Sequence, residues 1–216
     1  MKFARFPFVI VVILVAAGFG VRKAEAAPVP CVAGDLQVAK TAQTDARGTL
    51  QAAINFIKGS DPKTKALLVR WFGASDASTV ASVSGVFGRS NQWLGTVSFY
   101  CLYQNDGSNV SDIPTAAGMI RVDYSGELFA YVNPADLGKV NLGLAFFKAP
   151  ASTGYDSKLG TLVHEMTHYW ITGNTNSSFD DEYDKTKCLD MAKNNPTKAK
   201  ENAQNYEYFI EEWLAQ

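Results

Sequence analysis

The first third of the chain has apolar residues at intervals of three or four, which is the period of a helix. Three such stretches lie between residues 36 and 93, and two of them end at Gly59 and Gly73. A Ser75-Asp76 pair precedes the third stretch, where it can cap a helix. The periodic positions are Leu50, Ala53, Ile54, Ile57, Ala66, Leu67, Trp71, Val83, Val86 and Phe87. We predict three scaffold helices here, because the region holds no cluster of acids, histidines or glycines that suggests chemistry.

Between residues 95 and 147 the pattern changes to short apolar or aromatic runs, separated by Asn-Asp-Gly, Ser-Gly and Asn-Pro turn signals. Short runs with such boundaries are typical of strands. The predicted strands cover residues 97–103, 119–124, 128–132 and 140–146. They indicate a small, mostly antiparallel sheet.

Helical periodicity returns after residue 156. The apolar stripe consists of Leu159, Leu162, Val163, Met166 and Trp170. Asp156 or Ser157 can cap the start of this helix, and Gly173 can end it. His164 and His168, which are the only histidines of the chain, lie on the face opposite the stripe. One face is therefore expected to pack while the other binds.

The two histidines belong to an H-E-x-x-H motif at residues 164–168. On a helix, residues four apart lie about one turn apart, so both imidazoles can reach a single Zn²⁺ while Glu165 flanks it as a base for bound water. The alternative is a pair of histidines hydrogen-bonded in a core or facing solvent. We favour the metal site because both histidines share the polar face and further acidic residues follow.

A polar loop at residues 173–179 separates this helix from two more. One is predicted over residues 181–193 and is broken at Asn194-Asn195-Pro196. The last carries a packing stripe of Ala203, Tyr206, Phe209, Ile210 and Trp213. With no repeat or second domain in the pattern, we expect residues 27–216 to form one α+β domain.

Residues 1–26 have the pattern of a signal peptide. Lys2 and Arg5 precede an apolar run, and Ala24-Glu25-Ala26 fits a cleavage site. Of the 20 basic and 21 acidic residues, this segment holds four and one, which leaves 16 and 20 and a net charge of −4. We therefore expect a secreted, monomeric protein, with no nucleic-acid partner and no stable membrane association after cleavage.

A catalytic zinc takes three protein ligands and leaves one position for water. The chain has no third histidine, and Asn174 stands where a three-histidine pattern would place it. The third ligand is then a carboxylate or a thiolate. The residues alone leave open a glutamate on a later helix and an aspartate soon after the loop.

Several segments, in order, resemble the deuterolysin and peptidyl-Lys metalloendopeptidase family, the aspzincins. They are A-Y-V-N-P at 130–134, V-N-L-G-L-A-F-F at 140–147, D-S-K-L-G-T-L-V-H-E-M-T-H at 156–168 and N-A-Q-N-Y-E-Y-F at 202–209, with weaker similarity at W-F-G 71–73 and S-F-Y-C 98–101. The resemblance spans most of residues 27–216. It implies a zincin-like fold and one Zn²⁺ per chain.

The resemblance also implies roles for individual residues. In the family an aspartate three residues before a tyrosine completes the zinc site, so Tyr183 identifies Asp180 as the third ligand, with Asp181 as the competing neighbour. Glu165 would accept the proton of the attacking water, and Tyr183 would stabilise the oxyanion. The spacer before Asp180 is longer than usual, and Asp184 stands where the family has glycine.

Substrate preference is implied by the last helix. Lysine-selective members place an aspartate and a glutamate there to bind the lysine ammonium at P1′, and the matching positions are Gln204 and Glu207. Half of the acidic pair is missing. We therefore expect at most a basic bias at P1′. The alternatives for Glu207 are a contact with a metal ligand or a position that faces solvent.

The chain has three cysteines, which in an oxidising compartment indicate one disulfide and one free thiol. The family joins an N-terminal cysteine to one in the S-F-x-C segment, which implies a disulfide between Cys31 and Cys101. Cys188 is then expected to be free and buried.

These observations predict a secreted, zinc-dependent endopeptidase that acts on proteins or peptides. One alternative is a gluzincin-type peptidase with Glu207 or Glu201 as the third ligand. The other is a non-catalytic secreted zinc-binding module, which Glu165 argues against because a structural metal site needs no base.

Overall fold

The computed structural model describes residues 29–59, 61–102, 110–115, 118–123, 128–132, 137–169 and 182–216. The predicted signal peptide at 1–26 lies outside these residues. So do Trp170 and Gly173 at the expected end of the metal-site helix, and both candidate third ligands, Asp180 and Asp181.

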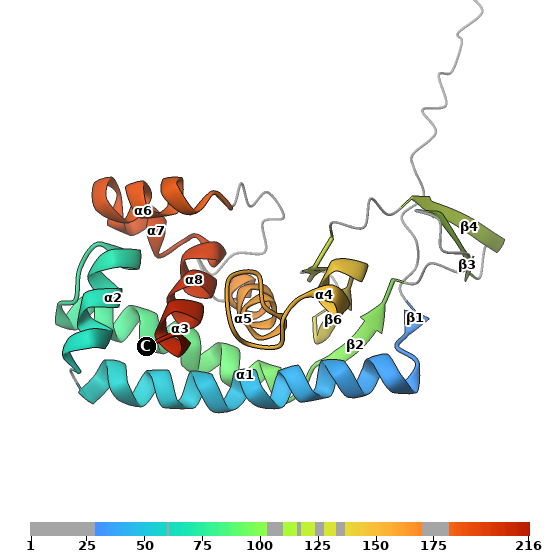
Figure 1. The fold of residues 1–216 in the computed structure, drawn as a ribbon, viewed down its shortest axis with the longest axis horizontal. Helices are drawn as coiled ribbons and strands as arrows, with labels where there is room; N and C mark the ends of the chain where they lie inside the picture. Colours follow the sequence, from blue (N-terminus) through green and yellow to red (C-terminus); the bar gives the residue numbers. More distant parts are fainter. Residues whose placement is uncertain are drawn as a thin grey trace, which may run out of the picture.

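Three helices build the N-terminal scaffold, as the apolar periodicity predicts. They are α1 (Ala33–Gly59), α2 (Pro62–Phe72) and α3 (Ala77–Leu94). The side chain of Asp76 accepts a hydrogen bond from the Thr79 amide and caps α3, and Gly73 ends α2 in a left-handed conformation with φ 77°. In Figure 1, α1 runs along one side of the molecule, and α5 and α8 lie against it.

Two helices form the centre of the protein. They are α5 (Lys158–His168) and α8 (Ala203–Leu214), which pack against each other and against α1. Aromatic side chains from α2, α3 and α8 fill the core beside them, and the largest fully buried ones are Trp71, Phe72, Phe87, Tyr206 and Phe209. Burial of this apolar surface holds the two central helices at a fixed separation.

The main sheet has the strand order β1-β2-β6-β5. Its strands are β1 (Val29–Pro30), β2 (Ser98–Cys101), β5 (Ala130–Tyr131) and β6 (Lys139–Leu142). β2 and β6 are parallel, whereas the other pairings are antiparallel. A separate antiparallel pair consists of β3 (Val110–Thr115) and β4 (Gly118–Asp123).

The strand predicted over residues 140–146 is wrong in its second half. β6 ends at Leu142, and a short helix α4 (Leu144–Lys148) follows. Gly143 makes the change possible, because a Cβ atom there would lie 2.1 Å from the carbonyl oxygen of Leu128. The helical turn then buries Phe146 in the core.

The later helices differ from the prediction in the start of α6 and in a further short helix, α7. α6 (Lys185–Asn194) begins four residues after the predicted Asp181, because the Asp184 side chain caps it through the Lys187 amide. Pro196 starts α7 (Pro196–Ala199), as the break at residues 194–196 predicts.

A disulfide joins Cys31 to Cys101, and Cys188 is a buried free cysteine. The bond ties the start of α1 to β2, next to the pairing of β1 with β2. Within the described part of the chain, no helix combines the length and the hydropathy that a membrane crossing requires.

Candidate metal centre

α5 carries both histidines and the glutamate of the motif. Its N-cap is Ser157, whose hydroxyl accepts a hydrogen bond from the Gly160 amide at 2.9 Å. The imidazole rings of His164 and His168 lie 4.8 Å apart between centroids. Atoms of His164, Glu165 and His168 that can bind a metal all lie within 4.8 Å of one another.

This donor set fits a zinc ion. Two imidazoles one turn apart with an adjacent carboxylate supply the nitrogen ligands that zinc prefers and a base beside them. The sequence places both histidines on a polar face, but in the structure His164 and Glu165 are only 4% and 6% exposed. The face is covered because α8 packs over it, which a local pattern does not reveal.

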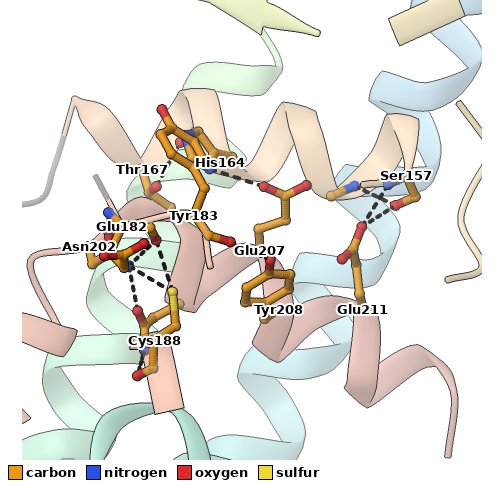
Figure 2. Close-up of polar contacts among 12 residues, drawn as sticks. Ser157, His164, Thr167, Glu182, Tyr183, Cys188, Asn202, Glu207, Tyr208 and Glu211 are labelled. Carbon is orange, nitrogen blue, oxygen red and sulfur yellow. Dashed lines mark hydrogen bonds and ion pairs between the residues drawn. The ribbon is translucent and has the colours of Figure 1, made fainter. Parts of the chain in front are cut away.

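Glu207 of α8 contacts the Nδ1 edge of the His164 imidazole. Its Oε2 atom lies 3.0 Å from Nδ1 of His164, and both side chains are buried (Figure 2). The carboxylate places a negative charge beside the Nδ1 edge of the ring. This charge favours a hydrogen on Nδ1, the tautomer that keeps the Nε2 lone pair available for a metal.

Tyr183 lies against a face of the same imidazole ring. Its aromatic ring stacks on His164 with centroids 5.7 Å apart and an interplanar angle of 15°. Its side chain is 60% exposed, so the phenol borders the solvent side of the site. The hydroxyl of Tyr208 donates to the Tyr183 carbonyl oxygen at 2.7 Å and holds its backbone in place.

Glu182, the residue before Tyr183, is held by three hydrogen bonds from the side chains of Asn202 and Cys188. The Glu182 amide donates to Oδ1 of Asn202, and Nδ2 of Asn202 donates to the Glu182 carbonyl, both at 3.1 Å. The Cys188 thiol donates to the same carbonyl at 2.9 Å, as Figure 2 shows. These contacts fix the chain immediately after the segment that contains Asp180 and Asp181.

A second carboxylate of α8 reaches the start of α5. Oε1 of Glu211 accepts hydrogen bonds from both the amide and the hydroxyl of Ser157, each at 2.8 Å (Figure 2). Gly160 leaves the space, because a Cβ atom there would lie 2.2 Å from that oxygen. Burial and the negative charge of Glu207 raise the pKa of the Glu211 carboxyl to about 8.

A cavity of about 370 Å³ opens beside the motif. It lies between α5, α8 and the segment that leads into β5. Its lining residues are Leu128, Phe129, Ala130, Asp156, Thr161, His164, Glu165, Tyr183, Gln204 and Glu207. The proposed substrate residues Gln204 and Glu207 thus face the same space as Glu165 and Tyr183.

A family model described as "Lysine-specific metallo-endopeptidase", that of the aspzincins, matches residues 57–211. The chain belongs to the aspzincin family. The match covers every described residue of the site, from Asp156 to Glu211.

Named aspzincin relatives agree with this assignment. A peptidyl-Lys metalloendopeptidase of Pleurotus ostreatus is 41% identical over 83 residues, which are 38% of this chain and 47% of the relative. One of Grifola frondosa is 47% identical over 88 residues, 41% of this chain and 24% of the relative. The chain thus spans less than half the length of these curated relatives.

A solved structure shows the same fold. A zinc peptidase from Grifola frondosa superimposes with a TM-score of 0.65 and 28% identity, over 86% of this chain and 99% of that one. The fold is thus that of a zinc peptidase, mostly helical with a small mixed sheet.

Several site residues were not predicted from the sequence. Asn202 and Glu211 carry no local signal, because each acts on a residue far away in the chain.

Glu201, a ligand candidate of the gluzincin alternative, is exposed on the turn before α8. Glu207, the other candidate, contacts Nδ1 of His164.

Proposed function

We propose that the chain is a secreted zinc endopeptidase with a bias towards a basic residue at P1′. The observation that carries the proposal is the convergence of His164, Glu165 and His168 within 4.8 Å, with the Glu207 carboxylate beside His164. His164 and His168 would hold the zinc, with Asp180 as the third ligand that the family pattern suggests. When bound, the ion would supply Lewis-acid activation of water and of the substrate carbonyl.

The side chains provide the proton transfers. Glu165 takes a proton from the attacking water and passes it to the leaving amine. The Tyr183 hydroxyl is placed to donate a hydrogen bond to the oxygen of the attacked carbonyl, where negative charge develops. This is hydrolysis without a covalent enzyme intermediate. The fixed backbone at residues 182 and 183 supports the role of Tyr183.

The cavity supports the substrate preference. Glu207 and Gln204 line it from α8, and a buried carboxylate beside an amide favours a cationic side chain at P1′. The names of the relatives, peptidyl-Lys metalloendopeptidase, agree with lysine there. Secretion is supported by the disulfide and by an extracellular protease of Aeromonas hydrophila, which is 42% identical over 83 residues.

The test compares the wild type with Glu165→Gln and, as a matched control, Glu201→Gln. Zinc content is measured, and cleavage of an unfolded protein is mapped by mass spectrometry. We expect one zinc per chain in all three and cleavage in the wild type and the control. Zinc without cleavage in any of them would support the zinc-binding module instead, and absence of zinc would overturn the site.

Asp180→Asn and Glu207→Gln separate the two peptidase classes. Loss of nearly all zinc from the Asp180 variant supports the aspartate ligand. Retention there, with complete loss from the Glu207 variant, would support a gluzincin-type site.

A further inference from the structure

Asp156 lines the cavity beside the metal centre but takes no part in the chemistry assigned so far. It lies on the loop before α5, and its side chain is exposed. We propose that Asp156 is a specificity-determining residue, which binds the positive group of a lysine or arginine side chain at P1′. This inference rests on the proposed function and identifies a residue that selects the substrate class.

The cavity is negatively charged and lacks a counter-charge from its own walls. Three carboxylates line it, those of Asp156, Glu165 and Glu207, and none of its lining residues is a lysine or arginine. Among the described residues, no lysine or arginine forms an ion pair with Asp156 or Glu207. A cation that enters this space therefore meets the charges of Asp156 and Glu207, which no lysine or arginine of the cavity wall neutralises.

The other polar residues of the cavity add to this preference but are more constrained than Asp156. Glu207 is committed to Nδ1 of His164, and Glu165 stands beside the metal position. Gln204 carries no charge. Its Nε2 atom is buried without a hydrogen-bond partner, and the side chain is only 2% exposed. A 180° rotation of the Gln204 side-chain amide exchanges its nitrogen and oxygen. The oxygen then gives an incoming ammonium group a second acceptor.

The backbone around Asp156 is held in an unusual conformation. Its φ is 56°, in the left-handed region that aspartate and asparagine tolerate better than most residues. The neighbours on both sides are anchored to α8. The Tyr155 hydroxyl donates to Glu212 at 2.7 Å, and the Ser157 amide donates to Glu211 at 2.8 Å. The loop thus presents the Asp156 carboxylate from a fixed position.

The spacing fits a long side chain. Ser157, the neighbour of Asp156, precedes His164 by two helical turns, or about 10 Å along the axis of α5. When the scissile bond of a substrate lies beside Glu165, the P1′ side chain therefore has to be long and extended in order to reach Asp156. Lysine and arginine combine that length with a positive charge, whereas norleucine has similar length without the charge.

The test uses three peptides that differ only at P1′, which is lysine, arginine or norleucine. In Asp156→Asn, which keeps a residue suited to the left-handed backbone, the ratio of kcat/KM for lysine over norleucine should fall about three- to fivefold. Asp45→Asn, an exposed substitution on α1, is the matched control and should keep the wild-type ratio. Should Asp156→Asn fail to fold, Asp156→Gly accommodates the same φ and replaces it.

Two outcomes overturn the inference. An unchanged ratio would mean that Asp156 does not contact the cation, and an equal loss with all three peptides would mean that it only shapes the loop.

A binding measurement separates this inference from the proposed function. Zinc-loaded Glu165→Gln protein is titrated calorimetrically with the lysine and norleucine peptides. Tighter binding of the lysine peptide, reduced about three- to fivefold by adding Asp156→Asn, supports the inference even if the wild type cleaves nothing. Equal affinity for the lysine and norleucine peptides, or no binding of either, overturns the inference.

Discussion

Oε2 of Glu207 lies 3.0 Å from Nδ1 of His164 in the buried interface between α8 and α5. Four residues later on α8, Glu211 accepts two hydrogen bonds from Ser157. The last helix therefore contacts α5 at two points, which lie about one turn apart on α8 and two turns apart on α5. One contact is with a candidate metal ligand, and the other holds the start of the helix that carries it.

Replacing Glu207 with glutamine should weaken zinc binding. The amide keeps the shape of the carboxylate but no longer places beside Nδ1 the negative charge that makes the imidazole a better donor to the metal. We expect a loss of about 10- to 100-fold in zinc affinity, measured by competition with a chromogenic chelator. Glu201→Gln is the control, and equal affinity in the two variants would contradict the role of Glu207.

The Glu211 carboxyl should make stability depend on pH. Its pKa is raised from 4.5 to about 8 in the folded protein, so between these values the folded state holds a proton that the unfolded state has lost. The free energy of unfolding therefore falls as the pH rises from about 5 to about 8, and this contribution is lost above the folded pKa. Glu211→Gln, which stays neutral, should show a smaller decrease.

Urea unfolding at pH 6, 7, 8 and 9 measures this difference. The exposed Glu201→Gln variant should follow the wild type throughout. Parallel curves for the wild type and Glu211→Gln would show that the carboxyl is already ionised at pH 6.

Gly160→Ala should destabilise the protein, although alanine favours helices. Its Cβ atom would displace the Glu211 oxygen from Ser157, at a cost of about 1–3 kcal/mol. In a Glu211→Ala background the same change should be neutral or stabilising by up to about 1 kcal/mol. A double-mutant cycle from denaturant unfolding gives the coupling energy. Gly88→Ala on α3, where a Cβ atom meets nothing, should act alike in both backgrounds.

Tyr208→Phe should lower kcat. It removes the hydroxyl that holds the Tyr183 carbonyl, so the phenol proposed to stabilise the oxyanion loses part of its positioning. We expect about 1 kcal/mol of lost stability and a several-fold lower kcat with zinc retained. Tyr206→Phe, on the same helix as Tyr208, loses the hydrogen bond to the carbonyl oxygen of Lys200 and should cost similar stability while leaving kcat unchanged.

The features that could be predicted from the sequence are those with a local cause. Helix periods, the Asp76 cap and the Gly73 stop depend on residues a few positions apart, and the structure contains them. The four-residue spacing in H-E-x-x-H places His164 and His168 together for the same reason.

What the sequence did not reveal depends on residues distant in the chain. The burial of His164 results from α8 packing over it, and the early end of β6 results from the close approach of Leu128 to Gly143. Asn202 forms hydrogen bonds with Glu182, and Glu211 accepts them from Ser157. Each pair is too far apart in the sequence for a local pattern to reveal the contact.

The space between Gly160 and Glu211 also constrains how such a chain diverges. A side chain at position 160 and a long carboxylate at position 211 exclude each other, because both need the same volume above Ser157. Substitution at one position is therefore tolerated only after, or together with, a change at the other. In a set of aligned relatives these two positions should vary as a pair, although 50 residues of the chain lie between them.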